Sequence, residues 1–170
     1  IGYFLHPEKL TNFSQMGGEG GHWIGRAPFS NHKHTFQNIG DGTYAHSGSL
    51  AIRAAVSANV NITFKILYND AVAMTGGQKA IGGATPWAIS KQLAAEGVKK
   101  IYVVSDEPEQ FKELKLFADK VGIFHRDELI NIQKEVREIS GVTAIIYVQT
   151  CATEPVSYTH LTLPTSGGVW

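Results

Sequence analysis

The sequence predicts an α/β domain in which a parallel β-sheet is covered by helices on both faces. Strand-like and helix-like segments alternate from residue 34 to residue 149, which is the pattern of strand–helix–strand units. The last strand-like segment, residues 142–149, is apolar almost throughout, as expected of a strand that is buried on both faces. The chain has 170 residues, of which 43% are hydrophobic, so it is long enough for one domain with a core.

The first half of the chain predicts two strands joined by a helix and followed by a glycine-rich loop. We expect the helix to begin at Thr43, because a threonine before an apolar-periodic segment is a common N-cap. The tripeptide Gly40-Asp41-Gly42 then lies between the first strand and this helix. The expected strand, helix, strand and loop cover residues 34–39, 43–58, 62–68 and 69–85.

The second half predicts three helices and two further strands, which gives four strands in all. Pro86 suits the first turn of a helix, and Gly97 suits its end. Two later segments have apolar residues at helical spacing and charged residues between them. The expected helix, strand, two helices and strand cover residues 87–96, 100–104, 107–120, 126–139 and 142–149.

The composition excludes several classes of protein. Lys plus Arg and Asp plus Glu each number 15, and this lack of a basic excess argues against a nucleic-acid partner. No apolar run approaches the roughly 20 residues of a membrane span. Cys151 is the single cysteine, so an internal disulfide or a cluster held by several thiolates of this chain is impossible. This cysteine content favours a cytoplasmic location.

Both ends of the sequence suggest a fragment of a longer chain. It begins at Ile1 in what reads as mid-sequence, and we expect a domain over residues 1–154. Residues 155–170 are expected to be a non-native tail. Within them, VSYTHLTLPT at residues 156–165 resembles the translated read-through of a transposon-end adapter used in sequencing libraries. The alternative is a genuine edge strand with a flexible end.

Deleting residues 156–170 is therefore expected to leave folding intact. A thermal melt of the shortened chain beside the full chain tests this expectation. A large drop in melting temperature would show that the tail belongs to the folded domain.

Two short polar motifs follow the first two expected strands. Gly40-Asp41-Gly42 follows the first, and Asn69-Asp70-Ala71 follows the second. The 26 residues between them, 43–68, are used up by one helix and one strand. Because parallel strands end at the same edge of a sheet, where ligands bind, we expect the two motifs to meet there.

The residue types at this edge suit a magnesium-bound diphosphate. Asp41 supplies a carboxylate, Asn69 a side-chain carbonyl, and the following loop a backbone carbonyl such as that of Ala71. Such hard oxygen ligands suit Mg²⁺, which usually keeps water and phosphate oxygens as its other ligands. The N–H groups at the start of the helix favour a phosphate at the same place. Gly40 and Gly42 allow a close backbone approach.

The spacing of these motifs resembles the thiamine diphosphate signature, in which GDG is followed after about this distance by Asn. Four blocks resemble, more particularly, the thiamine-binding region of indolepyruvate ferredoxin oxidoreductase, with the long single-chain form closest. TGGQ at residues 75–78 is typical of the broader 2-oxoacid:ferredoxin oxidoreductases. The resemblance covers roughly residues 1–154 and implies a thiamine diphosphate-binding fold. The blocks are SQMGGEG, HWIGRAPF, FQNIGDGTYAHSGSLAIRAAV and NITFKILYNDAVAMTGGQ, at residues 14–20, 22–29, 36–56 and 61–78.

The resemblance implies roles for individual residues. Asp41 and Asn69 would bind Mg²⁺ through their side chains, and Ala71 through its main-chain oxygen. Glu19 either approaches the cofactor or bonds to neighbouring backbone N–H groups. His46, in the first helical turn, either contacts the diphosphate or substrate or packs at the helix start. The full set of expected cofactor-binding positions is Gly18, Glu19, Gly40, Asp41, Gly42, Thr43, His46, Asn69, Ala71, Thr75 and Gly76.

The implied reaction is the oxidative decarboxylation of a 2-oxoacid, an arylpyruvate such as indolepyruvate. Coenzyme A would accept the acyl group, and ferredoxin would accept electrons singly. The glutamate that activates the cofactor, and any iron–sulfur ligands, would come from other domains or a second subunit, so this segment alone should bind the cofactor weakly and not turn over. Two alternatives are a non-redox thiamine lyase or carboligase of the acetolactate-synthase kind, and a non-catalytic phosphate-binding module.

Overall fold

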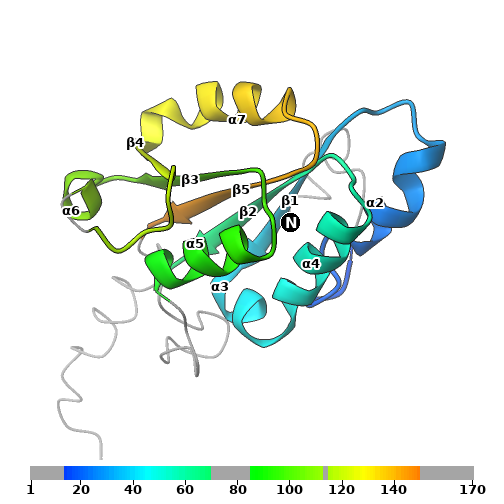
Figure 1. The fold of residues 1–170 in the computed structure, drawn as a ribbon, viewed down its shortest axis with the longest axis horizontal. Helices are drawn as coiled ribbons and strands as arrows, with labels where there is room; N and C mark the ends of the chain where they lie inside the picture. The colour runs from blue at the N-terminus through cyan, green and yellow to red at the C-terminus, as the bar shows by residue number, and fades with distance from the viewer. Residues whose placement is uncertain (1–13, 70–84, 113–114, 150–170) are drawn as a thin grey trace, which may run out of the picture.

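The computed structural model describes residues 14–69, 85–112 and 115–149, and within them it shows a five-stranded sheet (Figure 1). All neighbouring strands are parallel, in the order β1-β2-β5-β3-β4. The predicted α/β class with a parallel sheet is confirmed. The strands are β1 Thr35–Gly40, β2 Ile62–Tyr68, β3 Lys100–Ser105, β4 Gly122–His125 and β5 Val142–Val148.

Helices cover both faces of the sheet, as predicted. In Figure 1, α4 and α5 lie on one face, and α7 lies on the other. None of the helices in the described parts of the chain is long and apolar enough to cross a membrane. The helical elements are α2 Gly21–Arg26, η1 Ala27–Phe29, α3 Asp41–Thr43, η2 Tyr44–Gly48, α4 Ser49–Ser57, α5 Pro86–Ala95, α6 Glu109–Lys112, η4 Arg126–Glu128 and α7 Leu129–Arg137.

The core has one layer on each face of the sheet. On the α4 and α5 side, Phe64 and Ile66 of β2 are completely buried with Leu93 of α5. On the α7 side, Tyr102 and Ile145 are buried with residues of α7. The alternation along β2 and β5 places successive side chains in opposite layers.

The expected helix over residues 107–120 is wrong in length, and β4 was not predicted. Among the described residues of this stretch the structure has only α6, and turns are present from residue 115. The rings of Phe111 and Phe117 meet edge to face at 6.1 Å, and Ala118 N–H donates to Ser90 Oγ of α5. The bond to α5 and the packing of the two rings accompany turns in place of the helix that the spacing predicted. β4 has four residues and is only partly buried, so it carries little strand signal.

Thr43 is not the N-cap that the sequence predicted. The helical segment begins two residues earlier, at Asp41, and Gly40 before it is extended, with φ −74° and ψ 152°. Thr43 lies inside the segment and is buried. An aspartate in the first turn is favourable because its charge opposes the positive end of the helix dipole.

A row of polar side chains crosses the opposite end of the sheet, where the strands begin. His34 Nε2 lies 2.9 Å from Thr63 Oγ1, which lies 2.7 Å from Thr143 Oγ1. The other ring nitrogen of His34, Nδ1, is buried and has no hydrogen-bond partner in the described part of the chain. Burial lowers the pKa of His34 to about 4, and Arg137 adds to this shift while Glu138 opposes it.

The free energy of unfolding is therefore expected to fall as the pH drops from about 6.5 towards 4. In this window the unfolded chain binds a proton at His34 that the folded chain rejects, so acid favours unfolding. His34→Gln should flatten this part of the pH profile in urea denaturation, while His32→Gln, at an exposed position nearby, should not. An unchanged profile in His34→Gln would assign the acid sensitivity to other groups.

Candidate functional site

The site is built where β1 and β2 end side by side. Gly40, the last residue of β1, is in register with Leu67, next to the end of β2. The backbone N–H of Asn69 donates to Asp41 Oδ2 at 3.0 Å. Asp41 of the first motif and Asn69 of the second thus meet at one edge of the sheet, as the spacing of the sequence predicted.

The Asp41 carboxylate is fixed by backbone groups on both of its oxygens. Oδ2 accepts the bond from Asn69, and Oδ1 accepts a bond of 2.7 Å from Gly42 N–H. A carboxylate oxygen has two lone pairs, so accepting one N–H bond is compatible with binding a cation. Because the carboxylate is half-buried and oriented by the backbone, it would need little reorganisation to act as a ligand.

The space beside Asp41 is suited to a ligand. A Cβ at Gly40 would meet no atom of the described residues within 4 Å, so that part of the chain leaves room at this position. The helical segment starts here, and its first N–H groups lack partners within the helix. The Thr43 side chain is buried, so a contact between Thr43 and a phosphate would go through its backbone.

A π-helical turn follows directly, over Tyr44–Gly48. Such turns are rare and occur frequently at functional sites. A Cβ at Gly48 would lie 2.1 Å from Ile39 Cδ1 and 3.2 Å from the Thr43 carbonyl oxygen. Only glycine therefore lets the helix approach β1 so closely.

The glycine-rich loop before α2 packs against this turn. Gly17 has φ +94°, and a Cβ there would lie 2.4 Å from Ser47 Oγ. Glu19 is 8% exposed, and its Oε2 accepts a 2.6 Å bond from Gly17 N–H. The bond agrees with the alternative in which Glu19 bonds to a neighbouring backbone N–H group. A contact between Glu19 and the cofactor stays a prediction.

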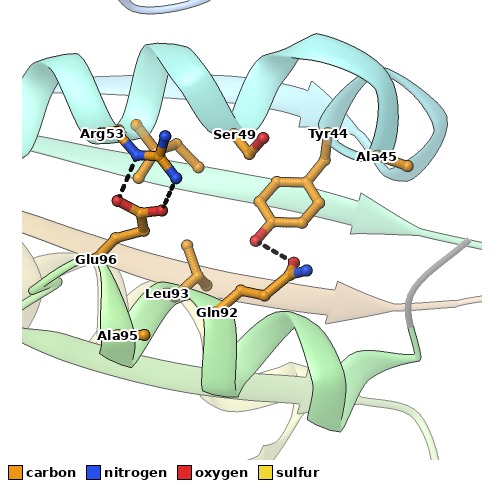
Figure 2. Close-up of a pocket in the computed structure, with 9 residues that line it drawn as sticks. Tyr44, Ala45, Ser49, Arg53, Gln92, Leu93, Ala95 and Glu96 are labelled. Atoms are coloured by element: carbon orange, nitrogen blue, oxygen red, sulfur yellow. Dashed lines mark hydrogen bonds and ion pairs between the residues drawn. The ribbon is translucent and has the colours of Figure 1, made fainter. Parts of the chain in front are cut away.

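The helix of the site is braced against α5. Tyr44 Oη donates to Gln92 Oε1 at 3.0 Å, and Arg53 Nε donates to Glu96 Oε2 at 2.8 Å (Figure 2). These pairs bridge a groove of about 270 Å³ between α4 and α5. Burial, with Glu96 as a second cause, raises the pKa of Tyr44 to about 12, so its hydroxyl stays a neutral donor. These two pairs connect the helical segment that begins at Asp41 to α5.

The structure brings together only part of the predicted site. Asp41, Gly42 and Asn69 meet, and the loop with Gly18 and Glu19 lies against the adjoining turn. His46 is exposed, which does not fit its reading as a packing residue. Ser47 was missed, because a lone serine carries no sequence signal. Three predicted positions lie outside the described residues: Ala71, Thr75 and Gly76.

Comparisons with known proteins point to one cofactor. Residues 4–123 match the family described as thiamine pyrophosphate enzyme, C-terminal TPP binding domain. The indolepyruvate oxidoreductase subunit IorA of Thermococcus kodakarensis is 30% identical over 115 residues, which are 67% of this chain and 16% of that protein. The chain therefore spans about a sixth of that relative. The resemblance seen in the sequence is confirmed.

Two solved structures share the fold. A 2-oxoglutarate:ferredoxin oxidoreductase from Magnetococcus marinus aligns with a TM-score of 0.59 and 15% identity, covering 81% of this chain and 46% of the other. A benzoylformate decarboxylase from Polynucleobacter necessarius aligns with a TM-score of 0.50 and 16% identity, covering 75% and 22%. At these identities the likeness concerns the fold alone. The chain belongs to the thiamine pyrophosphate enzymes, and it matches their C-terminal TPP-binding domain.

Proposed function

We propose that this chain is the segment that binds thiamine diphosphate and Mg²⁺ in an oxidoreductase that decarboxylates a 2-oxoacid. The observation that supports it most is the hydrogen bond between Asn69 and Asp41, which joins the two halves of the signature. In the proposal, Asp41 and Asn69 bind Mg²⁺ through their side chains, and Ala71 through its main-chain oxygen. Gly42 and Thr43 face the diphosphate.

The donor set of the described residues fits this group. A backbone-oriented carboxylate beside the amide residue Asn69 offers the oxygen ligands that Mg²⁺ prefers. The start of the helical segment offers N–H groups to phosphate oxygens. The space that the described residues leave at Gly40 would let a ligand approach the backbone.

When bound, the cofactor supplies a thiazolium carbon nucleophile and an electron sink for decarboxylation. The residues of this chain bind and orient. Asp41 holds the cation in place, and the brace from Tyr44 to Gln92 keeps the helix start in a fixed position. A fixed diphosphate determines where the reactive end of the cofactor lies, which is the contribution of proximity to catalysis.

The whole protein is proposed to act on an arylpyruvate such as indolepyruvate, with coenzyme A as acyl acceptor and ferredoxin as electron acceptor. The IorA relative supports this choice. Iron–sulfur clusters and the activating glutamate would lie in other domains or a second subunit. A cytoplasmic location belongs to the same proposal.

Calorimetry tests the cofactor assignment. We expect weak, saturable binding of thiamine diphosphate that requires Mg²⁺ and is tighter than binding of inorganic pyrophosphate with Mg²⁺. Equal affinities for the two would favour the phosphate-binding module, because such a module ignores the thiazolium and pyrimidine rings.

Spectroscopy of the full-length protein tests the reaction class. Iron–sulfur absorption that bleaches when indolepyruvate and coenzyme A are added would support the oxidoreductase. Decarboxylation without any cluster would instead assign the protein to the non-redox lyases or carboligases, which share this fold.

A further inference from the structure

Ser47 lies between the glycine-rich loop and the turn that follows Asp41. The backbone of Gly17 passes so close above it that a Cβ at Gly17 would lie 2.4 Å from Ser47 Oγ and 3.3 Å from Ser47 Cβ. Glu19 holds Gly17 in this position through the 2.6 Å bond to its N–H. The Ser47 side chain is therefore confined from one side by a loop that is itself fixed.

The confined hydroxyl contacts His46. Ser47 Oγ lies 2.7 Å from His46 Nδ1, and His46 itself is exposed. If the hydroxyl donates to Nδ1, the neutral imidazole carries its proton on Nε2. The imidazole then presents an N–H donor to the solvent side, which is the form needed to bind an anionic oxygen.

His46 lies on the same helical segment as Asp41 of the candidate site. It follows Asp41 by five residues in one helical segment, which is about 7 Å along a helix axis. The π-helical turn that contains it is also the surface on which the glycine-rich loop packs. A ligand held at Asp41 and the helix start would therefore lie beside the same helical segment that carries the imidazole.

We propose that Ser47 is a positioning residue, which fixes the His46 imidazole through Nδ1 so that Nε2–H binds an anionic oxygen of the ligand at the Asp41 site. This inference rests on the proposed function, because the anionic oxygen belongs to the diphosphate or to the carboxylate of a bound 2-oxoacid. Ser47 acts through His46 and has no contact of its own with the ligand.

The first test needs no ligand. Nitrogen-15 NMR of the chain at pH 8.5, above the range in which histidine ordinarily titrates, should show His46 mainly as the Nε2–H tautomer. Ser47→Ala should shift His46 towards a mixture of tautomers, and Ser57→Ala, at the far end of the same helix, should not. A His46 spectrum that Ser47→Ala leaves unchanged would overturn the positioning role.

The second test is a double-mutant cycle on the affinity for thiamine diphosphate with Mg²⁺, followed by NMR titration. Ser47→Ala should weaken binding about fivefold, the effect of one hydrogen bond. His46→Ala should weaken it at least as much. Adding Ser47→Ala to His46→Ala should cause no further loss, because the serine acts through the histidine. Additive losses would overturn the inference.

A third titration, of phenylpyruvate into the cofactor-loaded chain, identifies the source of the anionic oxygen. If Ser47→Ala and His46→Ala already weaken the binding of thiamine diphosphate, the anionic oxygen belongs to the diphosphate. If they weaken only the later binding of phenylpyruvate, it belongs to the carboxylate. If neither variant weakens binding of either ligand while the wild type binds thiamine diphosphate, the role of Ser47 and His46 is refuted and the proposed function is not. A wild type that binds no thiamine diphosphate refutes the proposed function and the ligand role of His46, while the tautomer measurement still decides whether Ser47 fixes the ring.

Discussion

Asp41→Ala is expected to abolish the Mg²⁺-dependent binding of thiamine diphosphate. The substitution removes the carboxylate that both Gly42 and Asn69 orient through their N–H groups. A divalent cation that shares one charged protein ligand with a diphosphate loses most of its hold when that charge is removed. Calorimetry with thiamine diphosphate in the presence and absence of Mg²⁺ measures the effect.

Two variants make this result specific. Asp106→Ala removes a carboxylate after β3, which is paired with Arg126, and should leave cofactor affinity unchanged. Asp41→Asn keeps the size and one carbonyl oxygen but loses the charge, so it should bind far more weakly than the wild type. Wild-type affinity in Asp41→Ala would show that the cation, if bound, is held elsewhere.

Gly48→Ala is expected to destabilise the fold, although alanine favours a helix by about 1 kcal/mol over glycine. The added methyl would lie 2.1 Å from Ile39 Cδ1, and Ile39 is 2% exposed and cannot easily move aside. Overpacking of this kind costs about 1–3 kcal/mol, which outweighs the gain in helix propensity. Urea denaturation measures the change in the free energy of unfolding.

The cause of this effect can be isolated with a second substitution. Ile39→Val removes Cδ1, the atom that meets the new methyl, so the double variant Gly48→Ala/Ile39→Val should be more stable than the sum of the two single effects predicts. Gly25→Ala provides the matched control, because a Cβ there meets nothing within 4 Å inside a helix. It should be neutral or slightly stabilising. Equal effects of Gly48→Ala and Gly25→Ala would show that the close approach to β1 carries no cost.

The elements with the strongest periodic signals were the ones that the sequence predicted well. β2 lies at residues 62–68 as expected, and the expected strand at residues 142–149 is β5 with one residue fewer. The helix expected at residues 107–120 was different, since the described residues of that stretch contain only the short α6. There Ala118 N–H bonds to Ser90 Oγ of α5, which is 28 residues away in sequence and is not revealed by helical spacing.

The candidate site likewise has features that the sequence predicted and features that it did not. The spacing of Asp41 and Asn69 was enough to predict that they meet, since a helix and a strand of ordinary length return the chain to the same edge. The closeness of Gly17 to Ser47, and of Gly48 to Ile39, was not predictable. These contacts depend on how tightly a loop and a helix pack on β1, which single residues do not reveal.

The sequence by itself determined the class of the fold, the edge at which the site lies and the residues that meet there, because periodicity and the parallel arrangement of strands act along the chain. Only the tertiary structure decided the place of β4 in the sheet, the π-helical turn after Asp41, and the bonds that hold Glu19 and His46. The place of β4 depends on pairing between segments remote in sequence, and the bonds of Glu19 to Gly17 and of His46 to Ser47 are local bonds made where the glycine-rich loop packs closely on the turn after Asp41.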